Sequence, residues 1–258
     1  MITVTLKDRN GNLLAQTSHG QEAALCADRI YEEGDFYEIT GPAHLRIQAD
    51  VALPAGEVFL PEGRMTWRVP YGEHRLAYSP AAFTGTRHIF TAAAMTDEET
   101  GACRCISRNP SDLRGDTDFY PHCTANVETR NESCFAARNA IDGVLLNHFH
   151  GEWPFQSWGI GTREDACLEL DLGRTVTLEK AAIVLRADFP HDAYWVRGEL
   201  LPDDGSVISF ELGRTGERQW IDLGGEHRVR RVRLTHLIKS NDPSAFPALT
   251  QLELYGKD

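Results

Sequence analysis

The sequence predicts an all-β protein made of two β-sandwich, jelly-roll-like domains. Short segments of alternating hydrophobic and polar residues follow one another along most of the 258-residue chain, as in half-buried strands. Gly, Pro and Asn-Gly turn signals separate these segments at the spacing typical of sandwiches and barrels. No β-α-β pattern appears, so a parallel sheet covered by helices is not expected.

The first 115 residues are expected to form the first sandwich, whose role the sequence does not indicate. Residues 2–6 alternate, and the turn at Asn10-Gly11 leads into a second strand over 13–17. Residues 21–31 are the one early candidate for a helix, because their apolar side chains lie loosely at helical spacing. Further strands are expected over 36–40, 44–50, 57–60, 65–69 and 88–96.

Residues 104–120 form the natural boundary between the two halves. This stretch is polar, contains Asn109-Pro110 and Gly115-Asp116, and has no apolar period. We place the division near residue 116, which gives domains 1–115 and 116–258. The alternative is that the two halves share a packed interface and move as one body.

The second half begins with a strand near 121–129 and then one or two helical turns over 134–143, ended by Gly143. A long loop over 144–161 follows. Seven antiparallel strands then complete a sandwich; we expect them over 166–172, 181–186, 194–201, 207–212, 219–223, 229–238 and 249–255.

Four short motifs in this half carry a family resemblance. They are AIDG at 140–143, SWG at 157–159, LELDLG at 168–173 and QLELYG at 251–256. Together they resemble the discoidin, or coagulation-factor type C, family of galactose-binding-like domains. The resemblance covers about 121–256, roughly half of the chain. The whole chain also resembles bacterial two-domain proteins that are described only as carbohydrate-binding.

The resemblance implies a galactose-binding-like sandwich that binds sugars through the loops at one end. It also implies a structural calcium ion, with Asp142 and Glu253 at the two carboxylate positions. The chain departs from the family after Gly143, where 144–147 contain neither Thr nor Ser. The alternative is that Asp142 caps the turn and Glu253 faces solvent.

The loop between the strands over 181–186 and 194–201 is the centre of the expected sugar site. Aromatic rings offer an apolar surface to a pyranose, and charged side chains bind its hydroxyl groups. Trp158 is expected in the core, and Phe246 is expected to pack the turn over 240–250; the alternative is that this turn lines the same end of the sandwich as the loop over 188–195. The alternative for the charged loop is a buried salt-bridge corner that ties the two strands together. The expected ligand-binding residues are Trp153, Arg186, Asp188, His191, Asp192, Tyr194 and Trp195.

Composition limits the partners and the location. The formal net charge of −12 argues against nucleic acid and anionic membranes as partners. No signal peptide opens the chain and no apolar run is long enough to span a membrane, so we expect a cytoplasmic protein. The six cysteines are scattered and are expected to be reduced thiols. The oligomeric state stays open.

No G-x-S-x-G, H-E-x-x-H, phosphate-binding or dinucleotide-binding motif is present. We therefore expect a protein that binds a carbohydrate without transforming it. A protein–protein scaffold is the second hypothesis. It would be favoured if the Trp153 and Trp195 loops formed a flat apolar patch instead of a cleft. The third is a metal-assisted or acid–base enzyme using His150, Asp188 and His191.

Overall fold

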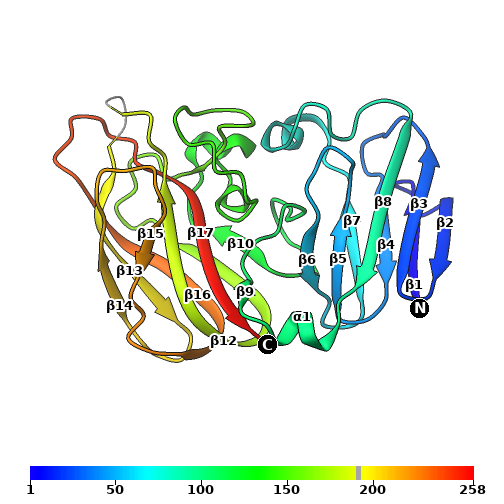
Figure 1. Cartoon of the computed structure of the whole chain (residues 1–258). Coiled ribbons are helices and arrows are strands. Elements are labelled where there is room, and N and C mark those ends of the chain that lie inside the picture. The colour runs from blue at the N-terminus through cyan, green and yellow to red at the C-terminus, as the bar shows by residue number, and fades with distance from the viewer. Residues whose placement is uncertain (190–192) are drawn as a thin grey trace.

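The structure, a computed structural model that describes residues 1–189 and 193–258, confirms the all-β fold. Two antiparallel sandwiches stand side by side, the N-terminal one blue to cyan and the C-terminal one yellow to red (Figure 1). The green segment of the chain lies between them and carries most of the short helices. The C-terminus lies beside the short helix α1 (Asp97–Gly101).

The N-terminal sandwich consists of two four-stranded sheets. The first has the order β2-β1-β4-β7 and the second the order β3-β8-β5-β6. Every strand pairing within them is antiparallel. The strands are β1 (Ile2–Lys7), β2 (Leu13–His19), β3 (Glu22–Asp28), β4 (Phe36–Thr40), β5 (His44–Gln48), β6 (Gly56–Phe59), β7 (Arg64–Arg68) and β8 (Arg87–Ala94).

The helix expected over 21–31 is wrong. Residues 22–28 form the strand β3, in which every second side chain is buried. Ala23, Leu25 and Ala27 point into the sandwich and contribute to its core. Burial alternates residue by residue, although Ala24 and Cys26 on the exposed face are themselves small and apolar; this is the period of a strand and not of a helix.

The C-terminal sandwich is built around one long strand, β12 (Leu168–Leu185), which the sequence had suggested as two. The main path runs β11-β17-β12-β16-β13-β14, with β10 and β15 also paired to β12, and β9 paired to β17. The other strands are β9 (Arg104–Cys105), β10 (His122–Ala125), β11 (Trp158–Gly159), β13 (Trp195–Pro202), β14 (Ile208–Glu211), β15 (Gln219–Ile221), β16 (His227–Lys239) and β17 (Ala248–Lys257).

The strand β12 belongs to both faces of this sandwich. Its first part, from Leu168 to Asp171, pairs with β10 and β16. Its last part, up to Leu185, pairs with β17 and β15. The pairing shifts register after Asp171, and Gly173 there has a positive φ of 74°. Such an irregularity lets one strand pass from one sheet to the other.

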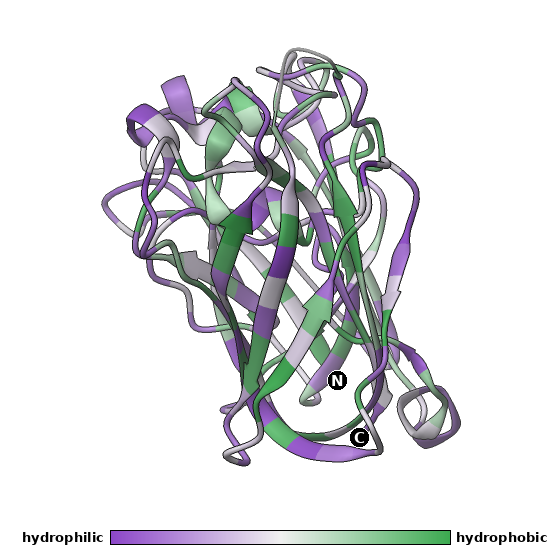
Figure 2. Cartoon of the chain, turned by 90° about the vertical axis from the view of Figure 1, so that its left-hand side faces the viewer, coloured by the Kyte–Doolittle hydropathy of each residue, from purple (hydrophilic) through white to green (hydrophobic). Residues whose placement is uncertain are grey.

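Hydrophobic and hydrophilic residues alternate along these strands, as Figure 2 shows. Trp158 is fully buried in the core, as expected. Before it, the chain makes short 3-10 turns, which agree with the helical turns expected over 134–143. These turns are η2 (Thr129–Asn131), η3 (Ser133–Phe135) and η4 (Ala137–Ala140), and a further one, η1 (Gly72–Ala77), follows β7.

The boundary segment over 104–120 contributes to both hydrophobic cores. Ile106 belongs to the C-terminal core, whereas Leu113 and Phe119 belong to the N-terminal core. The backbones of Phe59 and Tyr120 exchange two hydrogen bonds across this junction, of 2.7 and 3.0 Å. The chain therefore has two cores joined by a segment that is packed rather than extended in solvent. The division near residue 116 stays a prediction.

All six cysteines are free thiols. Within residues 1–189 and 193–258, no helix has the length and apolar character needed to cross a membrane.

Candidate functional site

Loops and 3-10 turns collect at one end of the two sandwiches (Figure 1). The loop over 144–157 is fixed there by Asn147, whose side-chain amide donates to the carbonyls of Leu185 (3.0 Å) and Gly216 (2.7 Å). The Asn147 carbonyl in turn accepts from the Ala187 amide at 2.6 Å. This loop is therefore tied to the end of β12, and it borders two hollows.

Two of the expected ligand-binding residues come together at the end of β12. Asp188 and Arg186 are both buried, and Arg186 Nε lies 3.4 Å from Asp188 Oδ1. His150 Nδ1 is hydrogen-bonded to Asp188 Oδ2, and Arg186 Nη2 donates to the Phe246 carbonyl at 2.9 Å. These contacts join the end of β12 to the loops that carry His150 and Phe246, and whether they serve a sugar site or a structural corner stays a prediction. His191 and Asp192 lie outside the described residues.

Arg186 and His150 line a hollow of about 250 Å³, which we call the loop-end hollow. The Phe246 ring is 53% exposed, so the expectation that it packs the turn is wrong. The loop over 240–250 instead offers this ring to the surface, and its backbone carbonyl holds Arg186. The hollow is lined by Thr129, Arg130, Phe135, His150, Gly159, Gly161, Arg186, Phe246, Pro247 and Ala248.

The expected sugar platform at Trp195 is wrong. Trp195 is 1% exposed, and its ring lies 6.3 Å from that of Trp158 in the core. A ring enclosed in this way has no face for a ligand. Tyr194 is half-buried against the same core and meets Phe189 edge to face at 6.0 Å.

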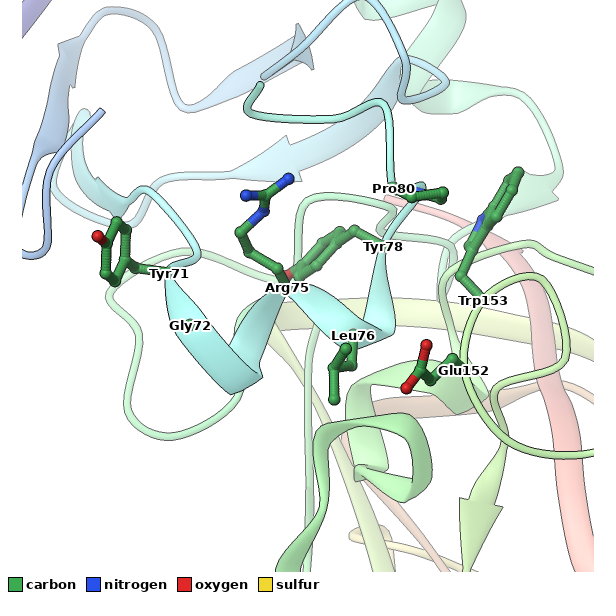
Figure 3. A pocket seen from close by; sticks show the side chains of 8 residues that line it. All are labelled: Tyr71, Gly72, Arg75, Leu76, Tyr78, Pro80, Glu152 and Trp153. Carbon is green, nitrogen blue, oxygen red and sulfur yellow. The ribbon is translucent and has the colours of Figure 1, made fainter. Parts of the chain in front are cut away.

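Trp153 lies away from this corner, in a second and larger hollow of about 460 Å³. We call it the inter-sandwich cleft, because the N-terminal half supplies one wall and the loop over 144–157 supplies the other (Figure 3). Trp153 is 38% exposed and Tyr71 is 46% exposed. The lining residues are Tyr71, Gly72, Arg75, Leu76, Tyr78, Pro80, Glu152 and Trp153.

Hydrogen bonds fix the two walls of the cleft against each other. The Trp153 amide donates to the Leu76 carbonyl at 3.2 Å. Next to the lining residue Gly72, the Glu73 carboxylate accepts from the Ser133 amide (2.5 Å) and hydroxyl (2.7 Å). Because these bonds join the two halves directly, the cleft is formed before any ligand arrives.

Two charged side chains of opposite sign, Arg75 and Glu152, also line the cleft (Figure 3). Arg75 Nη2 donates to the Ala82 carbonyl at 3.0 Å, which holds the guanidinium in place. Its Nε is buried and has no hydrogen-bond partner among the described residues. Glu152 is exposed on the opposite wall. Burial raises the pKa of Tyr78 to about 12, so its hydroxyl stays neutral and donates to the Asp112 carbonyl at 2.8 Å.

The two carboxylates that the resemblance assigns to calcium have separate partners. Asp142 Oδ1 accepts from the Val144 amide at 2.8 Å, and Oδ2 accepts from the Gln156 side chain at 2.7 Å. Glu253 is ion-paired with Arg218. Gln251 Nε2 also donates to Asp142 Oδ1 at 2.9 Å, so an N–H donor occupies the place that a calcium ion, which requires six to eight oxygen ligands, would take. Among the described residues, no three His, Cys, Asp or Glu side chains form a metal-binding group.

Sequence reasoning missed Tyr71 and Arg75, which lie in a half of the chain that had shown no site. A signal was present in Pro70-Tyr71-Gly72, an aromatic residue in a turn. An exposed aromatic side chain in a turn is common, however, and only the docking of the two halves places this one opposite Trp153.

The sequence matches no protein-family model and no curated protein. Solved structures that are similar to the chain include carbohydrate-binding modules. One is a chitosan-binding module of a chitosanase/glucanase from Paenibacillus sp. IK-5, with 16% identity, coverage of 59% of this chain and 99% of that one, and a TM-score of 0.42. Another is a Streptococcus pneumoniae fucose-binding module, with 16% identity, coverage of 60% and 99%, and a TM-score of 0.42.

A third similar structure is the family 32 carbohydrate-binding module of C. perfringens NanJ, solved with galactose. It has 17% identity, coverage of 52% of this chain and 91% of that one, and a TM-score of 0.40. Because these identities are below 20% and these TM-scores below 0.5, the proposals below depend on the contacts within this chain.

Proposed function

We propose that the protein binds a carbohydrate without transforming it, at the loop end of the molecule and within the inter-sandwich cleft. The observation that carries this proposal is the pair of exposed rings, Trp153 and Tyr71, which border one preformed cleft from different halves of the chain. Arg75 lies between the two rings and Glu152 lies beside Trp153, and both offer hydrogen-bonding groups (Figure 3).

The chemistry of the cleft suits a sugar. The C–H face of a pyranose packs on an aromatic ring, and its hydroxyl groups both donate and accept hydrogen bonds. A guanidinium offers only donors and a carboxylate only acceptors, so Arg75 and Glu152 together match a hydroxyl-rich ligand. The volume of about 460 Å³ falls within the range of small-molecule sites, roughly 300–1,000 Å³.

The shape of the site favours ligand binding over a scaffold role. A scaffold surface would present exposed aromatic residues on a flat apolar patch. Here Trp153 borders a hollow that also contains an arginine and a glutamate, and Trp195 is enclosed in the core. The fixed walls also reduce the ordering cost of binding, because little of the cleft has to rearrange.

Isothermal titration of the full chain with mono- and oligosaccharides, chosen first by a thermal-shift screen, tests the proposal. We expect Trp153→Ala and Tyr71→Ala each to raise the Kd about tenfold or more, equivalent to about 1.4 kcal/mol. The matched control is Trp220→Ala, since Trp220 is 58% exposed on β15 and does not line the cleft.

Sugar binding that survives both cleft variants but is lost in Phe246→Ala would overturn the cleft and place the sugar in the loop-end hollow. A chain that binds no sugar across the screen would overturn the function itself.

A further inference from the structure

The side-chain amide of Gln251 lies at the centre of a ring of oxygen atoms. Its Nε2 is 2.9 Å from the Asn139 carbonyl, 2.9 Å from Asp142 Oδ1, 3.3 Å from the Val144 carbonyl and 2.5 Å from the Thr250 carbonyl. An amide nitrogen has only two hydrogen atoms to donate. Four converging acceptors are more than one amide can satisfy.

The orientation of this amide is set by its other atom. Gln251 Oε1 accepts a hydrogen bond from the Gly143 amide at 2.9 Å. Rotating the amide by 180° would place Nε2 against the Gly143 N–H, donor against donor, and would leave the oxygen atom facing four other oxygens. The nitrogen is therefore the atom that belongs in the ring.

A ring of carbonyl and carboxylate oxygens around one point is also the environment of a hard divalent cation. Here that point is filled by a neutral N–H donor, and Asp142 contributes the only carboxylate of the ring. Gln251 and Asp142 are both buried, so solvent does not supply further ligands. The N–H groups of Gln251 thus connect the turn over 139–144 to the last strand.

We infer that Gln251 replaces a calcium ion in this chain, so that an amide holds the turn over 139–144 and no cation is needed there. The single change Gln251→Glu, which has almost the same shape, converts the ring into a calcium site. It removes both N–H donors and places a second carboxylate beside Asp142. Two carboxylates and three carbonyls then face one point. Arg138 Nη1 lies 3.9 Å from Asp142 Oδ2, the oxygen that does not bond Gln251, so a cation between the two carboxylates is what relieves their repulsion at the ring.

Thermal unfolding of the full chain in EDTA and in CaCl₂ tests this inference. We expect the melting temperature of the wild-type chain to be the same in both, within about 1 °C. We expect Gln251→Glu to melt at least about 5 °C lower than wild type in EDTA. Calcium should raise its melting temperature in a concentration-dependent way, because the ion binds only the folded state.

Two variants separate this site from other acidic groups. The double variant Gln251→Glu with Asp142→Asn should lose the calcium response. Glu253→Gln should show no calcium response, as in wild type, because Glu253 is paired with Arg218 outside the ring.

A wild-type chain that calcium stabilises, with the effect lost in Asp142→Asn, would overturn the inference, since the native ring would then hold the ion. A folded Gln251→Glu variant that ignores calcium would also overturn it. If Gln251→Glu does not fold, the melting temperatures of the wild-type chain in EDTA and in CaCl₂ still test whether the native ring binds calcium. The turn over 139–144 leads into the loop that carries Trp153. Because Gln251 and not a cation holds this turn, the sugar binding proposed above should persist in EDTA.

Discussion

Arg138 is the side chain that most directly ties the two sandwiches together, and replacing it by Met should lower stability strongly. Arg138 is 2% exposed. Its guanidinium donates to the carbonyls of Asp112 (2.7 Å), Pro110 (3.0 Å) and Ala77 (3.2 Å). It also stacks over the Tyr78 ring at 4.3 Å. Methionine keeps most of the apolar stem but removes every one of these polar contacts.

The magnitude follows from the three carbonyls that lose their donor. Hydrogen bonds to charged groups contribute about 1.5–3 kcal/mol each. Arg138 also borders a hollow of about 410 Å³ between the sandwiches, so water can reach part of the vacated space. We therefore expect a loss of about 3–5 kcal/mol in the free energy of unfolding, near the cost of breaking a buried charged pair. For a chain of this size that corresponds to roughly 6–20 °C in melting temperature.

Differential scanning calorimetry of the full chain measures this loss. The matched control is Arg130→Met, because the Arg130 side chain is mostly exposed and pairs with Glu132 at the surface. Such a surface change is expected to stay within about 0.5 kcal/mol of wild type. If Arg138→Met melted within about 2 °C of wild type, the guanidinium would not be what joins the halves.

Three further predictions concern stability. Trp195→Ala should lower the free energy of unfolding by about 3–5 kcal/mol in urea denaturation, because it empties a core position. Burial lowers the pKa of His122, but the charge and hydrogen bond of Asp112 outweigh it and raise the pKa above 6.5. Protonated His122 therefore stabilises the fold at low pH. Melting temperatures measured against pH should show this stabilisation disappearing as the pH rises through the folded-state pKa of His122. Gly256→Ala should cost about 1–3 kcal/mol or more in urea denaturation, because its Cβ would lie 2.2 Å from the Thr177 carbonyl oxygen.

Each of these predictions has a contradicting outcome. Trp195 would not be a core residue if Trp195→Ala cost no more than Trp220→Ala. The pH effect would belong to other groups if His122→Asn kept the wild-type dependence of melting temperature on pH. The close approach at Gly256 would be wrong if Gly256→Ala matched Gly213→Ala, where the added Cβ meets nothing closer than 3.6 Å.

The strands were predictable where one face of the strand is buried and the other is exposed to solvent. The strand expected over 36–40 coincides with β4, because its burial alternates residue by residue. The same principle explains the error over 21–31. Alanine favours helices intrinsically, but Ala23 and Ala27 lie at alternate positions that the tertiary structure buries.

The inward position of Trp195 could not be read from alternation. The pairing of β13 with β16 shifts register twice, between Trp195 and Arg197 and between Arg197 and Glu199. Each irregularity changes which side chains face the core. Trp195 and Gly198, three residues apart, are consequently both buried. A period-2 pattern would have placed them on opposite faces.

The site was predictable only in part, because it belongs to both halves. Trp153 could be expected at the surface from its neighbours Gly151, Glu152 and Pro154. Its position opposite Tyr71 follows from contacts between residues far apart in the chain. No local sequence pattern predicts that Tyr71 and Trp153 lie in the same cleft.

The two halves are joined at opposite ends, and this explains why the N-terminal half matters for binding. At the end near the C-terminus, Arg104 Nε donates to Glu57 Oε2 at 2.7 Å. At the loop end, Arg138 and the pair Glu73–Ser133 cross between the halves. Two separated attachments resist rotation of one sandwich against the other better than one does. The distance between Tyr71 and Trp153 is therefore fixed by the fold, and the N-terminal half acts as the second wall of the cleft.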